Sequence, residues 1–159
     1  MELETLKVAS FEIVFQEVPG EVTLALNISG CPNRCPGCHS PHLWEDTGEP
    51  LTEELLDALV DRYYPGITCV CFMGGDQDPD YIKTLSTRVH ERYEGLKTAW
   101  YSGQTNPEYH LSTFDFVKTG PYIESLGGLK SPTTNQRFYR RRGDIWIDET
   151  SSFWPARKC

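Results

Sequence analysis

Three cysteines lie close enough in this sequence to bind one metal group together. Cys31, Cys35 and Cys38 follow the spacing C-x3-C-x2-C. Iron–sulfur clusters usually take four cysteine thiolates as ligands, so three thiolates would hold three corners of a four-iron cluster and leave one iron open. An open iron can bind a substrate or a cofactor. The spacing therefore predicts a [4Fe–4S] cluster with an accessible fourth iron.

Two other uses of these cysteines remain open. They could bind zinc, with His39 or His42 as a fourth ligand, or belong to a disulfide framework. Structural zinc sites usually combine two closely spaced cysteine pairs, and the chain has no second C-x2-C pair. The remaining close pair, Cys69 and Cys71, stands in an apolar run that is typical of a buried strand. We expect these two residues to be small core side chains.

The length and composition of the chain limit the kinds of function that it can have. The chain has 159 residues, which predicts a single domain. Its six cysteines favour metal or redox chemistry over disulfides, because the N-terminus has neither the cationic flank nor the apolar segment of a signal peptide. No apolar run approaches the roughly 20 residues of a membrane span. We therefore expect a cytoplasmic protein with no membrane partner, and the net charge of −8 argues against nucleic-acid binding.

The elements that must position the cysteines alternate between strands and helices. Thr52 and Asp78 are expected to cap helices over 53–63 and from residue 79 onward. A third, short helix is expected near 107–113. The apolar runs predict strands at 21–28, 67–73, 96–101 and 114–117, with a further short strand at 144–148. This alternation predicts an α/β fold built from βαβ units around a parallel sheet.

Three features of the sequence fall where these strands end. The cysteine segment follows the first strand, Gly74, Gly75 and Asp76 follow the second, and Ser102 follows the third. Ligands of parallel α/β folds bind at the carboxyl ends of the strands. Backbone carbonyls at glycines can approach a ligand closely, and together with a carboxylate they suit an ammonium group. S-adenosylmethionine has such a group, and its amine and carboxylate could chelate the open iron.

The cysteine motif, followed by a strand that ends in Gly-Gly-acid, resembles the radical S-adenosylmethionine superfamily. Within it, residues 11–142 are similar to the family of activating proteins of anaerobic ribonucleoside-triphosphate reductase. The matching features are Gly37 before the third cysteine, Trp44 six residues after Cys38, Asp76 in place of glutamate, and the stretches 117–123 and 134–137. Lys118 and Thr119 depart from the valine–aspartate pair of that family, and the tail that ends in Cys159 matches no pattern of it.

The resemblance implies a fold and a set of site residues. The fold would be an incomplete parallel (βα) barrel over residues 1–142. Residues 143–159 lie outside the resemblance, and their sequence pattern predicts a flexible C-terminal tail. Three cysteines would hold the [4Fe–4S] cluster, whose unique iron would bind the amine and carboxylate of S-adenosylmethionine. The residues expected to contact this cofactor are Gly37, Cys38, His39, Gly74, Gly75, Asp76 and Ser102, the last at the ribose or the carboxylate.

The resemblance also implies an activity and partners. One electron from a low-potential donor would cleave S-adenosylmethionine into methionine and a 5′-deoxyadenosyl radical. That radical would take a hydrogen atom from a glycine of the large reductase subunit. Activation of another glycyl-radical enzyme, an enzyme acting on a small molecule and a non-catalytic electron-transfer module are the alternatives. The basic cluster of the chain is either a solvated face or a docking site for an acidic patch on the reductase; it comprises Arg137, Arg140, Arg141 and Arg142.

Overall fold

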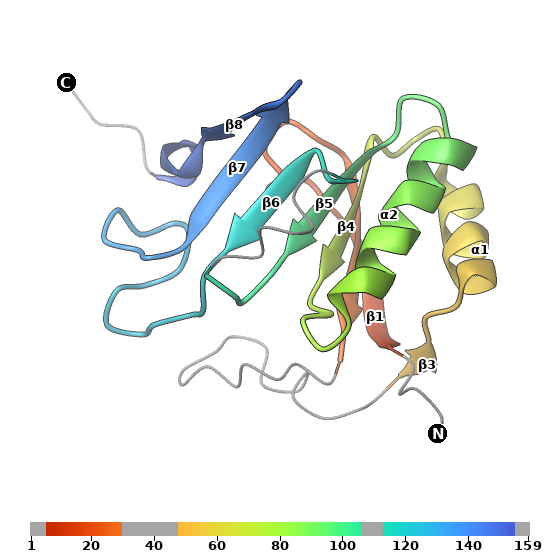
Figure 1. Cartoon of the computed structure of the whole chain (residues 1–159), viewed down its shortest axis with the longest axis horizontal. Helices are drawn as coiled ribbons and strands as arrows, with labels where there is room; N and C mark the ends of the chain where they lie inside the picture. Colours follow the sequence, from red (N-terminus) through yellow and green to blue (C-terminus); the bar gives the residue numbers. More distant parts are fainter. Residues whose placement is uncertain (1–5, 30–47, 106–112, 155–159) are drawn as a thin grey trace.

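The computed structural model describes residues 6–29, 48–105 and 113–154, which form one mixed sheet with two helices. Within these ranges the strand order is β3-β1-β2-β4-β5-β6-β7-β8. Figure 1 shows the sheet with its helices. The strands are β1 (Lys7–Val14), β2 (Thr23–Ile28), β3 (Glu49–Pro50), β4 (Cys69–Met73), β5 (Lys97–Tyr101), β6 (Phe116–Thr119), β7 (Arg137–Arg142) and β8 (Ile145–Asp148).

The centre of the sheet is parallel and its two flanks are antiparallel. β2, β4, β5 and β6 pair in parallel, whereas β1 pairs antiparallel with β2 and with β3, and β7 pairs antiparallel with β6 and with β8. The α/β class predicted from the sequence is confirmed. The prediction of a parallel sheet holds for the centre, and the flanking strands make the whole sheet mixed.

Both described helices begin where their capping residues predict. α1 (Glu53–Tyr63) follows Thr52, whose Oγ1 accepts a hydrogen bond from the Leu55 N–H at 3.0 Å. α2 (Pro79–Arg92) follows Asp78, whose Oδ1 accepts from the Tyr81 N–H at 3.3 Å. These bonds satisfy amide groups that a helix N-terminus otherwise leaves unpaired. The two helices lie side by side on one face of the sheet (Figure 1).

The two faces of the sheet bury different residues, as the period of two along a strand requires. The helix side has its own core, formed by α1, α2 and alternate residues of the parallel strands, such as Val70 and Phe72. The opposite face buries Cys69 and Cys71 against Phe116 and other side chains. Burial raises the pKa of both thiols, so they stay neutral. Their prediction as core residues is confirmed.

The C-terminal part of the described chain extends the sheet. β8 confirms the strand expected at 144–148, and its residues pair antiparallel with β7. A short 3-10 helix, Thr150–Phe153, follows it. The Phe138 N–H donates to Thr150 Oγ1 at 2.9 Å, which ties this turn to β7. The division of the chain at residue 142 stays a prediction. No described helix is long and apolar enough to cross a membrane.

Candidate functional site

The carboxyl ends of the four parallel strands meet along one edge of the sheet. Asn27 of β2 stands beside Met73 of β4, Met73 beside Tyr101 of β5, and Tyr101 beside Lys118 of β6. Residues that follow this row are therefore neighbours in space, although they are far apart in the sequence. β2 ends at Ile28, one residue after Asn27, and Ser29 is the last described residue before the cysteine segment.

Gly74 and Gly75 make the turn at the end of β4. Their φ angles are +114° and +90°, a region that favours glycine. A Cβ on Gly74 would lie 2.9 Å from the Ile28 carbonyl oxygen, so the turn also needs glycine for its close approach to β2. The Gly74 carbonyl accepts a hydrogen bond from Trp100 Nε1 at 2.8 Å. A carbonyl oxygen has two lone pairs, so this bond leaves room for a second donor.

Asp76 connects the end of β4 to the end of β5. Its Oδ1 accepts a hydrogen bond from Ser102 Oγ at 2.6 Å, and its Oδ2 accepts from the Gly103 N–H at 2.8 Å. The structure thus brings two of the sequence-predicted site residues, Asp76 and Ser102, into direct contact. Hydrogen bonds to a carboxylate are stronger than neutral ones, so this pair holds the acid at the carboxyl edge in a defined orientation.

Gln77 is a site residue that the sequence did not indicate. Its Nε2 donates to the Ser29 carbonyl oxygen at 2.8 Å. Ser29 is the last described residue before the cysteine segment, so this bond links the Gly74–Asp76 turn to the start of that segment. Its position directly after Asp76 was the available signal, but a glutamine in a turn usually faces solvent.

The predicted cluster ligands, Cys31, Cys35 and Cys38, lie outside the described residues, as do Gly37 and His39. Among the residues that the structure describes, no group of three or more histidine, cysteine or acidic side chains could hold a metal ion. The predicted residues that the structure does place are therefore those of the carboxyl edge: Gly74, Gly75, Asp76 and Ser102.

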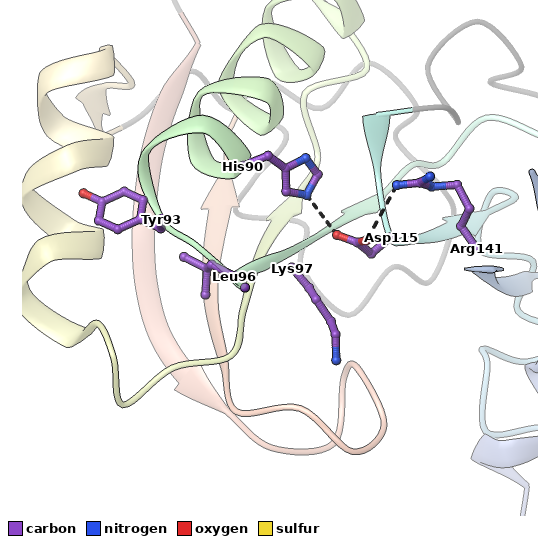
Figure 2. A pocket seen from close by; sticks show the side chains of 7 residues that line it. His90, Tyr93, Leu96, Lys97, Asp115 and Arg141 are labelled. Atoms are coloured by element: carbon purple, nitrogen blue, oxygen red, sulfur yellow. Dashed lines mark hydrogen bonds and ion pairs between the residues drawn. The ribbon is translucent and has the colours of Figure 1, made fainter. Parts of the chain in front are cut away.

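A pocket of about 360 Å³ lies at the opposite edge of the sheet, away from these residues. It is lined by residues at the starts of β5 and β6, including Lys97 and Asp115, and by His90 of α2. Figure 2 shows His90 and Arg141 directed at the Asp115 carboxylate. The distances are 2.9 Å from His90 Nε2 to Oδ2 and 3.7 Å from an Arg141 amino nitrogen to Oδ1. The groups satisfy one another, which fits a structural ion-pair network.

The ion-pair network around Asp115 changes the pKa of its carboxyl group. Burial is the largest single influence and raises the pKa of the carboxyl, but hydrogen bonds from His90 and the Thr98 N–H, together with charge attraction from His90 and Arg141, hold this pKa below its ordinary value. A lowered pKa in the folded chain stabilises the fold above the unfolded-state pKa. That contribution is lost as the pH falls through the folded-state pKa.

Asp115→Asn is therefore expected to lower the free energy of unfolding at neutral pH by about 1 kcal/mol, since solvent screens this half-buried charge. The loss should shrink in acid, where the wild-type carboxyl is itself protonated. Urea unfolding curves at neutral and acid pH measure both effects. The control is Asp144→Asn, which changes an exposed acid on the turn before β8. A loss of equal size at both pH values would contradict the lowered pKa.

Three arginines of the basic cluster form ion pairs within the chain. Arg140 Nε lies 2.8 Å from a Glu149 carboxylate oxygen, and Arg137 lies 3.6 Å from Asp148. Arg141 pairs with Asp115 as described above. The Arg140 guanidinium also lies 4.8 Å from the centre of a phenylalanine ring on β6. These contacts give the arginines a role in holding β7 in place, and docking to a partner stays a prediction.

Comparison with protein families gives one match that covers most of the chain. A model of the 4Fe-4S single cluster domain matches residues 18–136. The match contains all three cysteines of the motif and the whole carboxyl edge. It agrees with the iron–sulfur interpretation of the cysteine spacing.

Comparison with curated proteins gives relatives of one name. The chain is 25% identical over 118 residues to an anaerobic ribonucleoside-triphosphate reductase-activating protein of Salmonella typhi, covering 64% of this chain and 75% of that protein. It is 27% identical over 103 residues to the protein of the same name from Salmonella typhimurium, covering 58% of this chain and 65% of that protein. No solved structure matched the chain. The names confirm the family resemblance found in the sequence.

Proposed function

Because this chain belongs to the family of 4Fe-4S single cluster domains, we propose that it is a radical S-adenosylmethionine activase. It cleaves S-adenosylmethionine reductively at a [4Fe–4S] cluster and generates the glycyl radical on the large subunit of anaerobic ribonucleoside-triphosphate reductase. The names of the relatives from the two Salmonella species support this partner. A low-potential donor supplies the electron. The cytoplasmic location of the protein stays a prediction.

The observation that carries the proposal is that the residues following β2, β4 and β5 meet at one edge of the sheet, and that the cysteine motif comes next in the sequence after the first of these. Ser29, the last described residue before the cysteine segment, follows β2, the Gly74–Asp76 turn follows β4, and Ser102 follows β5. Gln77 is hydrogen-bonded to Ser29, and Asp76 is hydrogen-bonded to Ser102 and to the Gly103 N–H. A cluster bound at this edge would place its cofactor against a carbonyl and a carboxylate.

The residues present suit both the [4Fe–4S] cluster and S-adenosylmethionine. Three closely spaced cysteines supply the soft thiolates that iron–sulfur clusters take, in the number that leaves one iron open. The Gly74 carbonyl and the Asp76 carboxylate are acceptors only, which suits the ammonium group of S-adenosylmethionine. When bound, the cluster supplies the single electron that breaks the sulfonium carbon–sulfur bond. Gly37 and His39 are proposed as further contacts of the cofactor, whereas the buried Ser102 contributes by holding the Asp76 carboxylate.

The chain's own residues orient the cofactor. Asp76, held by Ser102 and the Gly103 N–H, presents a carboxylate of defined orientation to the amino group. Trp100 is fully buried beneath the turn and fixes the Gly74 carbonyl. A fixed edge of this kind lets the cofactor bind without rearranging the turn.

The finer fold that we propose is an incomplete (βα) barrel with the parallel strands as its wall. Both described helices cover one face of the sheet, as helices surround the strands of a barrel (Figure 1). The opposite face would then line the interior. An incomplete barrel leaves the mouth open, which suits a substrate that is a glycine-containing loop of another protein.

The proposal is tested by electron paramagnetic resonance of the partner. The chain is loaded anaerobically with iron and sulfide, then mixed with a reductant, S-adenosylmethionine and the large subunit of an anaerobic ribonucleoside-triphosphate reductase. A glycyl-radical signal that requires all components is the expected result. A loaded, reducible cluster that gives no signal and consumes no S-adenosylmethionine would favour an electron-transfer module instead.

Gln77→Ala tests the link to the cysteine segment. We expect a chelator to remove iron from the loaded variant about two- to tenfold faster, because one hydrogen bond at the start of the segment is lost. The bleaching of the cluster's visible absorption under anaerobic conditions gives the rate. Gln16→Ala, at an exposed position between β1 and β2, is the matched control and should bleach like wild type. Equal rates for all three proteins would contradict the anchoring role of Gln77.

A further inference from the structure

We infer that Lys118 is a positioning residue whose ammonium group fixes the turn after β5 and, through Ser102, orients the Asp76 carboxylate toward the cofactor. The inference rests on the proposed function, in which Asp76 meets the amino group of S-adenosylmethionine. It concerns a residue at which this chain departs from the valine–aspartate pair of the family it resembles. Valine has no hydrogen-bond donor in its side chain, so the contacts of Lys118 belong to this chain's own sequence.

Lys118 holds Ser102 through both of that residue's peptide groups. The Lys118 ammonium donates to the Ser102 carbonyl oxygen at 3.2 Å, and the Ser102 N–H donates to the Lys118 carbonyl oxygen at 2.9 Å. The ammonium also donates to the Gly120 carbonyl oxygen at 2.9 Å. One side chain thus joins the end of β5 to the end of β6, where the parallel ladder stops.

Ser102 passes this constraint on to Asp76. Ser102 is fully buried, and its Oγ accepts a hydrogen bond from the Gln104 N–H at 3.0 Å. That bond leaves the single hydroxyl proton of Ser102 for Asp76 Oδ1, 2.6 Å away. Because the Ser102 hydroxyl donates one hydrogen bond to Asp76 and accepts another from Gln104, a movement of the Ser102 backbone moves the Asp76 carboxylate with it.

An ammonium group suits this position for a chemical reason. Two carbonyl oxygens, of Ser102 and Gly120, converge on Lys118 Nζ, and a lysine ammonium has three donors and no acceptor. Lys118→Met keeps the length of the side chain but leaves both carbonyls without this donor. The variant should therefore loosen the turn after β5 without removing any group that touches the cofactor.

A double-mutant cycle tests whether Lys118 acts through Asp76. Binding of S-adenosylmethionine to the cluster-loaded protein is measured by anaerobic calorimetry for wild type, K118M, D76N and the double variant. K118M is expected to weaken binding about tenfold in the wild-type background and far less in the D76N background. Wild-type affinity in K118M, or the same loss in both backgrounds, would overturn the inference.

A second readout does not depend on the cofactor. Amide hydrogen exchange at residues 102–104 should be faster in K118M than in wild type, and unchanged in the control K97M. Lys97 pairs with Glu21 at the other edge of the sheet, 3.0 Å away, so K97M removes a comparable ammonium without touching the turn. Unchanged exchange in K118M overturns the inference whatever the calorimetry shows. A wild-type protein that binds no S-adenosylmethionine contradicts the proposed function itself.

Discussion

Replacing Cys35 by alanine is expected to leave the chain unable to hold an iron–sulfur cluster. The change leaves two thiolates, Cys31 and Cys38, for a cluster that already lacks a fourth cysteine. After anaerobic reconstitution, iron should fall from about four atoms per chain, the content of one [4Fe–4S] cluster, to nearly none. Iron and acid-labile sulfide analyses give the result directly, and the visible absorption of the cluster should disappear with them.

The matched control is Cys71→Ala. Cys71 is fully buried on β4 among apolar side chains, and burial raises the pKa of its thiol. Alanine there removes only a small core side chain, so the variant should keep its cluster. Full iron content in Cys35→Ala would refute the cysteine motif as the cluster site. Loss of iron from a folded Cys71→Ala variant would point to a ligand set that includes β4.

Asp76→Asn is expected to weaken the binding of S-adenosylmethionine by about ten- to a hundredfold. The amide removes the negative charge proposed to face the cofactor's amino group. It also turns an NH2 group toward one of two donors, the Ser102 hydroxyl or the Gly103 N–H. A hydrogen bond to a charged group contributes about 1.5–3 kcal/mol, and 1.4 kcal/mol is a factor of ten in affinity.

Anaerobic calorimetry on the cluster-loaded variant measures this loss. Asp78→Asn is the control, two residues along the same turn. Asparagine caps a helix as well as aspartate does, so α2 should keep its N-terminus while the chain loses the same charge. Equal affinity in Asp76→Asn and wild type would remove Asp76 from the proposed cofactor contacts. A similar loss in both variants would indicate an effect of net charge alone.

Much of the central fold could be predicted from local signals. α1 has the expected bounds, because Thr52 caps it and its apolar residues recur at helical spacing. β4 was expected because an apolar run bounded by glycines suits a strand covered on both faces. The meeting of Asp76 and Ser102 followed from the rule that carboxyl ends of parallel strands share an edge.

The sequence patterns of the flanking strands indicated a strand less clearly than those of the central strands. In β1 the pairing register shifts between Val8 and Ser10, so the alternation of apolar and polar residues is broken where it would have been diagnostic. β7 is rich in arginine, a residue that sequence patterns assign to solvent. Its arginines are held by contacts from other parts of the chain, such as Arg140 with Glu149. Such contacts appear only once the fold exists.

The hydrogen bonds that connect the residues of the candidate site could not be predicted from local sequence patterns either. Gln77 reaches Ser29 across 48 positions in the chain, and Trp100 reaches Gly74 across 26. Lys118 stood out in the sequence only as a departure from a family pattern. Its role depends on the row that places it beside Tyr101, and this row is set by strand pairing rather than by any neighbour in the sequence.

The most direct test of the central claim is the cleavage of S-adenosylmethionine. The chain is reconstituted anaerobically with iron and sulfide, reduced, and mixed with S-adenosylmethionine, and 5′-deoxyadenosine and methionine are quantified by chromatography. We expect equal amounts of both products from wild type and none from variants of Cys31, Cys35 or Cys38. A loaded and reduced protein that leaves S-adenosylmethionine intact, with or without the reductase, would contradict it, as would a colourless protein that holds zinc.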